Sequence, residues 1–266
     1  MQTDAVFAGP VPQLYDRHLG PFMFEPYAQA LAGRLDGSER DILETAAGTG
    51  IVTRAILRRL PSASVVATDL NQAMLDHAAA QVPQGRVRWQ QADAQALPFD
   101  DASFDLVVCS FGVMFMPDKL AAYGEARRVL RPGRRFLFTV WDRLDANPLS
   151  QIAHDTVGGM FPDDPPQFMA RTPFGHSDKA RLESDLRAAG FLRVAIETVA
   201  RESDIASVEG PAMGLTQGTP LRGEIEGRDG ARLAEATQAT AAAFRGRYGE
   251  GPFKAPLQAL VVEASA

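Results

Sequence analysis

Two glycines and two carboxylates are the residues best suited to chemistry in this sequence. Gly48 and Gly50 close the segment ILETAAGTG, and the acids Asp69 and Asp93 follow further along the chain. Glycine tolerates positive φ and lets a ligand approach the backbone where a Cβ would collide. A carboxylate accepts hydrogen bonds from the hydroxyls or amines of a ligand. Together these residues predict one ligand site, formed where three consecutive strands end.

Asp69 is placed to bind a ribose. It closes an apolar run over residues 64–67, about where a strand–turn–helix–strand unit returns to the sheet. Its carboxylate could accept hydrogen bonds from a ribose diol. The alternative is that Asp69 only caps the helix expected over residues 72–81. Its register with the glycine turn favours the ribose.

Asp93 is placed to bind a base. It follows the strand expected over residues 86–90, in which apolar Val87 and Trp89 alternate with polar neighbours. Its carboxylate could accept a hydrogen bond from an exocyclic amine such as that of adenine, while Ala94 offers its amide to the ring. The alternative is a turn aspartate that binds its own backbone. Here too the register favours the ligand.

The glycine turn joins a strand to a helix. Ile42 and Leu43 form a short apolar run that suits a buried strand. After the turn, helical spacing places Val52, Ile56 and Leu60 on one face of residues 51–60. The pattern is therefore strand, glycine turn, helix.

Four segments give the chain a family resemblance: LETAAGTG, ATDLNQAML, QADAQALPF, and residues 104–141 with their RPGR turn. The chain resembles the class I S-adenosylmethionine-dependent methyltransferases, in the methyltransferase type 11-like branch near the ubiquinone- and menaquinone-biosynthesis enzymes. Ala47 stands where family members often carry cysteine or glycine. The resemblance implies an α/β fold: a Rossmann-like, seven-stranded, mostly parallel sheet with helices on both faces, an antiparallel last strand and helical lid insertions.

The resemblance also implies a site for S-adenosyl-L-methionine, which would leave as S-adenosyl-L-homocysteine. The methionine end is expected against the first strand end and its turn, at Glu44, Ala46, Gly48 and Gly50. The adenosine end is expected after the next two strands, at Asp69, Leu70, Met74, Asp93 and Ala94. Ser110 and Phe111 would close the methionine end.

The implied reaction is in-line methyl transfer to an oxygen, nitrogen or carbon atom of a small, partly apolar metabolite. Holding acceptor and methyl at near-attack distance is worth roughly 7–11 kcal/mol. A general base is not identified by the sequence; the candidates on expected lid elements are Tyr15, Asp16, His18, His154 and His176. No metal is expected, because the histidines stand far apart in the sequence.

The chain divides into an N-terminal helical lid over residues 1–40 and a methyltransferase domain over residues 41–266. Two substrate-side insertions are expected, at about residues 145–176 and 203–250. The first is rich in proline, methionine and phenylalanine; its apolar residues are Ile152, Val157, Met160, Phe161, Phe168, Met169 and Phe174. In the lid, Tyr15, Phe24 and Tyr27 belong to an aromatic cluster. Both groups could cover a ligand or simply pack in the core.

Composition limits the partners. With 266 residues, 45% hydrophobic and 23% charged, the chain can bury a sizeable core. A net charge of -6 and scattered arginine pairs argue against nucleic acid as a partner. No stretch of about eighteen apolar residues occurs, and the N-terminus lacks the features of a signal peptide. We therefore expect a cytoplasmic protein with no membrane insertion and a small-molecule acceptor; the oligomeric state is left open.

Two other functions share parts of this pattern. An NAD(P)-dependent oxidoreductase would use the same turn and ribose acid, but Thr53 occupies the third glycine position of its motif. A member of the methyltransferase fold could also bind the cofactor without transferring a methyl group, in a regulatory or rearrangement role. The sequence does not separate this second alternative from a methyltransferase, because residues that bind the cofactor do not show whether its methyl group is transferred.

Overall fold

A single sheet organises the computed structural model, which describes residues 4, 7 and 9–266. Its seven strands run in the order β3-β2-β1-β4-β5-β7-β6. The strands are β1 (Asp41–Glu44), β2 (Ser64–Asp69), β3 (Arg88–Gln91), β4 (Phe104–Ser110), β5 (Leu130–Trp141), β6 (Arg193–Ile205) and β7 (Phe253–Ser265). The predicted mostly parallel, Rossmann-like sheet is confirmed.

The pairing of the strands explains where a site can form. β1 lies between β2 and β4 and is parallel to both, with Glu44 opposite Ala67 and Val108. β7 runs antiparallel between β5 and β6, as predicted for the last strand. Parallel strands end at the same edge of a sheet, so the segments after β1, β2, β3 and β4 meet there.

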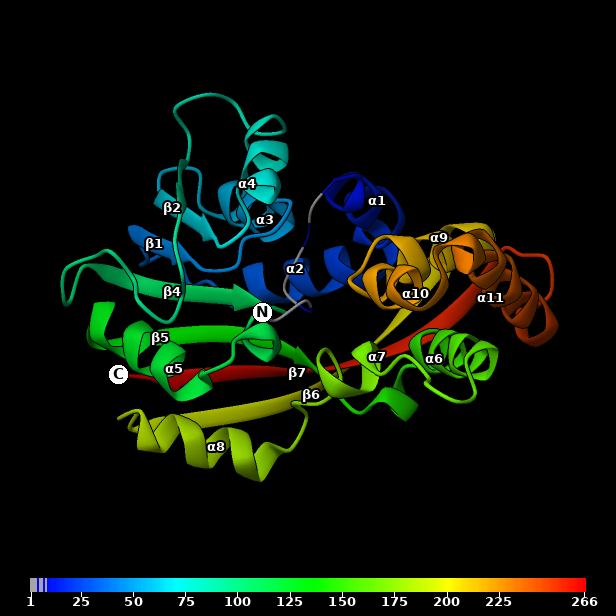
Figure 1. Ribbon diagram of the computed structural model, residues 1–266. Coiled ribbons are helices and arrows are strands. Elements are labelled where there is room, and N and C mark those ends of the chain that lie inside the picture. The colour runs from blue at the N-terminus through cyan, green and yellow to red at the C-terminus, as the bar shows by residue number, and fades with distance from the viewer. Residues whose placement is uncertain (1–3, 5–6, 8) are drawn as a thin grey trace.

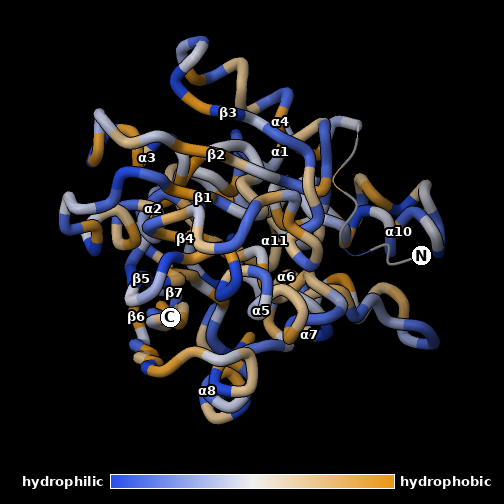
Figure 2. The backbone as a smooth tube through the Cα atoms, turned by 90° about the vertical axis from the view of Figure 1, so that its left-hand side faces the viewer, coloured by the Kyte–Doolittle hydropathy of each residue, from blue (hydrophilic) through white to orange (hydrophobic). Residues whose placement is uncertain are grey.

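The centre of the sheet forms the core. Ile42, Leu43 and the apolar residues of β4 are almost completely buried, as expected for strands covered on both faces. Figure 2 shows hydrophobic residues concentrated along the central strands β1 and β2. Cys109 is fully buried within β4, and burial raises the pKa of its thiol to about 12.

Helices cover both faces of the sheet (Figure 1). They are α2 (Glu25–Ala32), α3 (Ile51–Arg59), α4 (Gln72–Ala79), α5 (Lys119–Val129) and α8 (Lys179–Ala188). α3 and α4 begin where the sequence predicts them. α8 begins at Asp178, whose side chain accepts hydrogen bonds from the amides of Ala180 and Arg181. This cap fixes the helix start that leads the chain back into β6.

A second group of helices gathers at the edge where the parallel strands end (Figure 1). It contains α1 (Val11–His18), α6 (Pro148–Met160), α7 (Phe168–Arg171), α9 (Glu209–Gln217), α10 (Leu221–Asp229) and α11 (Leu233–Tyr248). A π-helical turn, η2 (Gly20–Phe24), joins α1 to α2, and single turns of 3-10 helix are η3 (Val113–Phe115), η4 (Leu144–Ala146) and η5 (Gly230–Arg232). We call the six α-helices of this group, α1, α6, α7, α9, α10 and α11, the lid helices. Helices α6 and α7, from the first expected insertion, lie beside α9, α10 and α11, from the second.

The N-terminal helices are tied into the core. Leu19 and Tyr27 are almost fully buried, and the Tyr27 hydroxyl donates to the carbonyl of Val199 at 3.1 Å. The Ser203 hydroxyl donates to the carbonyl of Phe22. The aromatic cluster of the N-terminal segment therefore packs against the sheet, and only part of it faces a ligand site.

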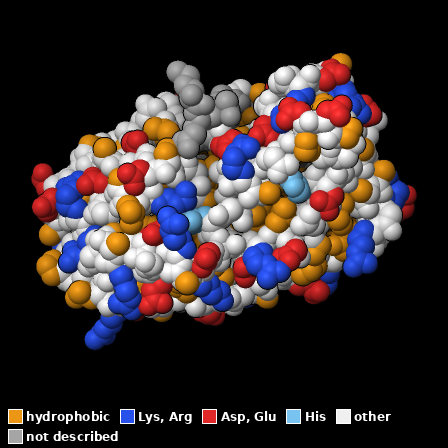
Figure 3. Space-filling view, turned by 60° about the horizontal axis from the view of Figure 1, so that its bottom comes forward, with side chains coloured by type: hydrophobic (Ala, Val, Ile, Leu, Met, Phe, Trp, Pro, Cys, Tyr) orange, Lys and Arg blue, Asp and Glu red, His pale blue; other side chains and the backbone are white. Residues whose placement is uncertain are grey.

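The surface offers no concentrated charge on the face that Figure 3 displays, where basic and acidic side chains are interspersed. On α8, two ion pairs join residues one helical turn apart, Arg181 with Asp185 and Arg187 with Glu183. Among the residues described by the structure, no helix is long and apolar enough to cross a membrane.

Candidate functional site

One cavity of about 390 Å³ lies where the strand ends meet the lid helices. From the sheet side it is lined by residues that follow β1, β2, β3 and β4: Ala46, Gly48, Asp69, Leu70, Met74, Asp93, Ala94, Ser110 and Phe111. Elsewhere it is lined mainly by rings and thioethers, which come from η2, η3, the end of β5 and the segment at α7: Met23, Phe24, Phe115, Trp141, Phe168, Met169 and Phe174. The structure thus brings most of the predicted cofactor residues together beside an apolar wall.

Asp69 joins the first two strand ends. Its carboxylate accepts hydrogen bonds from the amides of Gly48 at 2.9 Å and Asn71 at 2.8 Å. Burial raises the pKa of this carboxyl, although the two amides oppose that effect. Asp69 does not cap α4, because Asn71 occupies the cap position and no side chain caps that helix. Oδ2, which accepts from the Gly48 amide, retains acceptor capacity for a ligand hydroxyl, whereas Oδ1 accepts from both the amide and the side chain of Asn71.

The glycine turn is narrow and left-handed. Gly50 begins α3 at φ 77°, and a Cβ there would lie 3.0 Å from the Cβ of Ala78. Two non-glycine residues of the lining, Ala46 and Phe111, also have positive φ, at 51° and 53°. Such backbone strain is held in place only when the surroundings fix it, and it concentrates at ligand sites. Here it marks the ends of the neighbouring strands β1 and β4, where they border the cavity.

Asp93 has two roles in the geometry. Its carboxylate accepts hydrogen bonds from the backbone amide of Gln95 at 2.9 Å and from the Gln95 side chain, so it does form the predicted alternative, an Asx turn. It nevertheless lines the cavity beside Ala94. Leu70 is 53% exposed next to the buried Met74, leaving an apolar surface against which a flat ring could pack.

Ser110 and Phe111 lie at the opposite side of the turn. The Ser110 hydroxyl is hydrogen-bonded to the hydroxyl of Thr139 at 3.1 Å, which also accepts from the Phe111 amide. The Phe111 ring stacks on Trp141, with ring centroids 4.0 Å apart. Trp141 in turn stacks on Phe174, at 5.9 Å. A continuous aromatic wall therefore runs from the end of β4 into the lid.

Two predicted cofactor residues, Glu44 and Gly50, do not line the cavity among the residues described. The Glu44 carboxylate is buried behind the turn and accepts a hydrogen bond from the Thr53 hydroxyl at 2.5 Å. Burial raises the pKa of Glu44 to about 8. From this position Glu44 supports the glycine turn, and Gly50 contributes to the turn through its left-handed backbone conformation.

Of the candidate bases, Tyr15 alone lines the cavity. Its ring stacks on Phe24 at 4.6 Å. Burial raises the pKa of the Tyr15 phenol, and the nearby Asp69 and Asp16 carboxylates raise it further. The Tyr15 phenol therefore keeps its proton at neutral pH. The Asp16 carboxylate itself lies 3.4 Å from His77 Nε2, 3.6 Å from Arg54 Nη2 and 3.1 Å from Gln81 Nε2.

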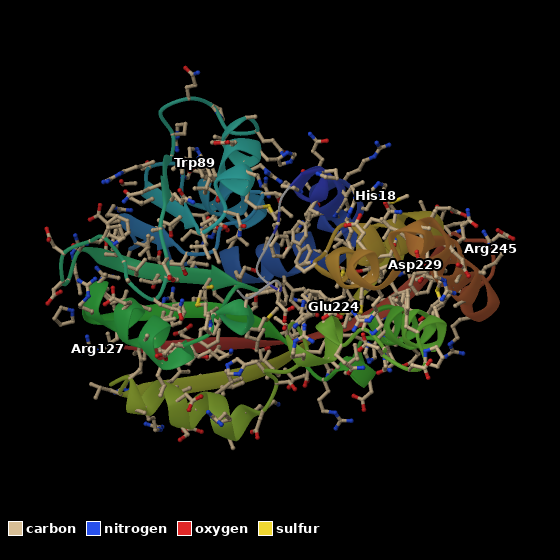
Figure 4. All side chains as sticks on the ribbon, in the orientation of Figure 1. His18, Trp89, Arg127, Glu224, Asp229 and Arg245 are labelled. Carbon is tan, nitrogen blue, oxygen red and sulfur yellow. The ribbon has the colours of Figure 1, made fainter. Side chains whose placement is uncertain are left out.

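The three histidine candidates lie outside the cavity lining. Figure 4 shows His18 at the end of α1, beside the lid helices. His176 is hydrogen-bonded through Nε2 to the Tyr123 hydroxyl at 3.0 Å, and burial and the nearby Lys119 lower the pKa of His176 to about 4. His154 lies on α6. Among the described residues, no group of three or more histidine, cysteine or acidic side chains is placed to hold a metal ion.

Several lining residues were not predicted from the sequence. Trp141 and Asn71 were inside recognised segments but had no role assigned, and Ser150, Leu215 and Thr219 come from the lid helices. Of the apolar residues in the first insertion, Phe168, Met169 and Phe174 line the cavity, whereas Ile152, Val157, Met160 and Phe161 do not. Helical spacing could not separate these two groups, because it does not reveal which face of a lid helix meets the cavity.

The fold and the strand-end site define the class I methyltransferase architecture, and the comparisons with known proteins agree. A model of the family "Methyltransferase domain" matches residues 42–133. The ubiquinone/menaquinone biosynthesis C-methyltransferase UbiE of Stutzerimonas stutzeri is 33% identical over 187 residues, covering 65% of this chain and 72% of that protein. The chain belongs to the class I S-adenosylmethionine-dependent methyltransferases, near the UbiE type.

Two further comparisons show how varied the similar proteins are. UbiE of Idiomarina loihiensis is 33% identical over 167 residues, 58% of this chain and 66% of that protein, so the chain spans about two thirds of its length. The structure of Haemonchus contortus phosphoethanolamine N-methyltransferase 2, solved with phosphomonomethylethanolamine and S-adenosylhomocysteine, covers 96% of this chain and 56% of that one with a TM-score of 0.62. At 17% identity, that likeness shows the fold alone.

Proposed function

We propose that this protein transfers a methyl group from S-adenosylmethionine to a small, largely apolar molecule that carries no phosphate. The observation behind this proposal is the composition of the cavity. It joins the predicted adenosine residues to an aromatic and methionine wall, and among the described residues that line it there is no lysine, arginine or histidine. A phosphorylated acceptor, such as the one bound in the Haemonchus structure, needs cationic partners that this lining does not provide.

The residues present fit the cofactor. Asp69 would bind the ribose hydroxyls, Leu70 and Met74 would pack on the adenine, and Asp93 with Ala94 would bind its edge. Ala46, Gly48, Ser110 and Phe111 would surround the methionine moiety. When bound, S-adenosylmethionine supplies a methyl group on a positively charged sulfur, ready for displacement by a nucleophile. The aromatic wall would exclude water and favour the positive charge.

The cavity favours an acceptor that needs no protein base. Tyr15 keeps its proton, and the carboxylates of Asp69 and Asp93 are engaged by backbone amides. Catalysis would then rest on holding the acceptor in line with the methyl group. An amine, an ionised oxygen or an activated carbon would serve as the nucleophile. The proposal covers all three kinds of acceptor atom.

Each of the two alternative functions, oxidoreductase and non-methylating cofactor-binding protein, can be tested separately. An NAD(P)-dependent oxidoreductase would be stabilised thermally by NAD(P)H and unaffected by S-adenosylmethionine. A non-methylating member would bind S-adenosylmethionine, yet form no S-adenosylhomocysteine with any amine, phenol, carboxylate or carbon acceptor. We expect stabilisation by S-adenosylmethionine and formation of S-adenosylhomocysteine.

The same assay tests the absence of a protein base. Tyr15→Phe and His176→Ala should each retain turnover to within about threefold, because a general base contributes roughly 100-fold or more. The same retention is expected of His18→Ala and His154→Ala, since His18, His154 and His176 all lie outside the cavity lining. A loss of roughly 100-fold in any one of the four variants would identify a base and contradict this part of the proposal.

A further inference from the structure

One hydroxyl in the lid side of the cavity has no hydrogen-bond partner among the residues that the structure describes. Ser150 is completely buried on α6 and lines the cavity, and its Oγ makes no hydrogen bond with the part of the chain that the structure describes. A buried hydroxyl that stays unsatisfied costs free energy. Other lid hydroxyls do not share this state: Thr219, also in the lining, donates to the carbonyl of Leu215 at 2.8 Å.

The position of Ser150 is held firmly by the sheet. Asn147, one turn earlier, accepts a hydrogen bond from the Gln258 amide at 2.9 Å and donates to the Gln258 carbonyl at 3.0 Å. These bonds attach the start of α6 to β7, so the helix backbone that carries Ser150 is held against the sheet. Preorganised polar groups of this kind determine orientation in otherwise apolar ligand sites.

The residues that line the cavity indicate the chemistry of the rest of the ligand. The same cavity is lined by rings and methionines, among them Phe111, Trp141 and Phe174, whose rings stack on one another and are almost completely buried. α6 lies across the molecule from β2, whose end carries the ribose site (Figure 1). Ser150 is therefore a polar group of the acceptor side.

We infer that Ser150 binds the methyl acceptor, and that this acceptor is a largely apolar molecule with one hydrogen-bonding oxygen facing α6. The apolar body would contact the aromatic and methionine lining, and the oxygen would pair with the Ser150 hydroxyl. This inference rests on the proposed function only in assigning the lid side of the cavity to the acceptor. Ser150 acts here as a specificity residue, with no part in the proton chemistry.

The inference is tested by binding, without turnover. Protein saturated with S-adenosylhomocysteine is titrated with 1-naphthol, naphthalene and 1-naphthyl phosphate, followed by tryptophan fluorescence. Wild type should bind naphthol more tightly than naphthalene by about two- to tenfold, the range of one neutral hydrogen bond. Ser150→Ala should abolish that preference while binding naphthalene as before. Naphthyl phosphate should bind more weakly than naphthol.

A matched control separates recognition from structure. Thr240 is a fully buried lid hydroxyl on α11 that donates to the Ala236 carbonyl at 2.8 Å and does not line the cavity. Thr240→Val should lower the melting temperature and keep the naphthol preference. Ser150→Ala should melt no lower than wild type, since it removes an unsatisfied group.

Three results would overturn the inference: an intact naphthol preference in Ser150→Ala, no preference in wild type, or tighter binding of naphthyl phosphate. The proposed function fails separately, if wild type forms no S-adenosylhomocysteine with any acceptor. Because the titration uses no methyl donor, a naphthol preference lost in Ser150→Ala would stand even in that case.

Discussion

A Cβ atom placed on Gly112 would lie 2.5 Å from the Cβ of Ala46. The segments after β1 and β4 therefore approach so closely that no side chain fits between them. Cys109 closes the remaining side, because its Sγ would lie 2.7 Å from the same added atom. Ala46 and Phe111, both left-handed, lie beside this contact in the lining of the cavity.

Gly112→Ala should lower the free energy of unfolding by about 1–3 kcal/mol, the usual cost of overpacking. It should also weaken binding of S-adenosylhomocysteine, since Ala46 must move. Gly124→Ala in α5 is the control: a Cβ there meets nothing within 4 Å, and alanine favours a helix by roughly 0.5–1 kcal/mol. Urea unfolding and calorimetric titration measure both effects. A Gly112→Ala variant as stable as wild type would show that the close approach is not tight in solution.

Asp69→Ala should weaken cofactor binding by roughly 1.5–3 kcal/mol, the range for hydrogen bonds to a charged group. The structure adds a second effect, because the amides of Gly48 and Asn71 lose their acceptor. Asp69→Asn keeps one acceptor oxygen, so it should restore part of the stability and little of the affinity. Asp76→Ala on α4 is the control, since Asp76 is exposed and does not line the cavity. Unchanged affinity in calorimetry would rule out the ribose assignment.

The sheet and its strand-end residues could be predicted because they depend on local signals. An apolar run, a glycine turn and an acid in register specify β1, β2 and the edge where they end. Glu44 shows the limit of this reasoning: it is in register, yet its carboxylate turns away to Thr53. Ser150 shows a second limit. Whether a lid residue faces the cavity depends on how the lid packs on the sheet, and periodicity carries no information about that.

Glu44 should make the protein less stable as the pH rises. The pKa of this carboxyl rises from 4.5 to about 8 on folding, so between these values the folded protein keeps a proton that the unfolded chain has lost. The free energy of unfolding must then fall across this window, by at most about 1.4 kcal/mol per pH unit from this group. The pKa of Asp69 is also raised by burial, and this effect has the same sign.

Glu44→Gln should flatten that pH dependence, because a neutral amide neither gains nor loses a proton. The measurement is urea unfolding at a series of pH values from 5 to 8. Glu226→Gln on α10 serves as the control, since Glu226 pairs with Arg222 at the surface and should leave the slope unchanged. Equal slopes for Glu44→Gln and wild type would mean that Glu44 is ionised in the folded protein.

Phe7 connects the N-terminal segment to both sides of the cavity mouth. Its ring packs edge-on against Tyr15 and Phe115, with centroids 5.9 and 5.8 Å apart, and its amide donates to Asn71 Oδ1 at 3.4 Å. Phe7 also lines the cavity. Its side chain can therefore exclude water while the buried Leu19 and Tyr27 keep the N-terminal helices in place.

Phe7→Ala should lower kcat/KM by roughly tenfold, equivalent to about 1.4 kcal/mol of lost stabilisation in the transition state. Its melting temperature should fall no more than that of Phe99→Ala. Phe99 is the matched control because it is half-buried and packs edge-on against one ring, Phe104 at 5.2 Å, away from the cavity. The readouts are initial rates of S-adenosylhomocysteine formation and thermal unfolding. Full activity in Phe7→Ala would mean that the N-terminal segment packs on the sheet without covering the reaction.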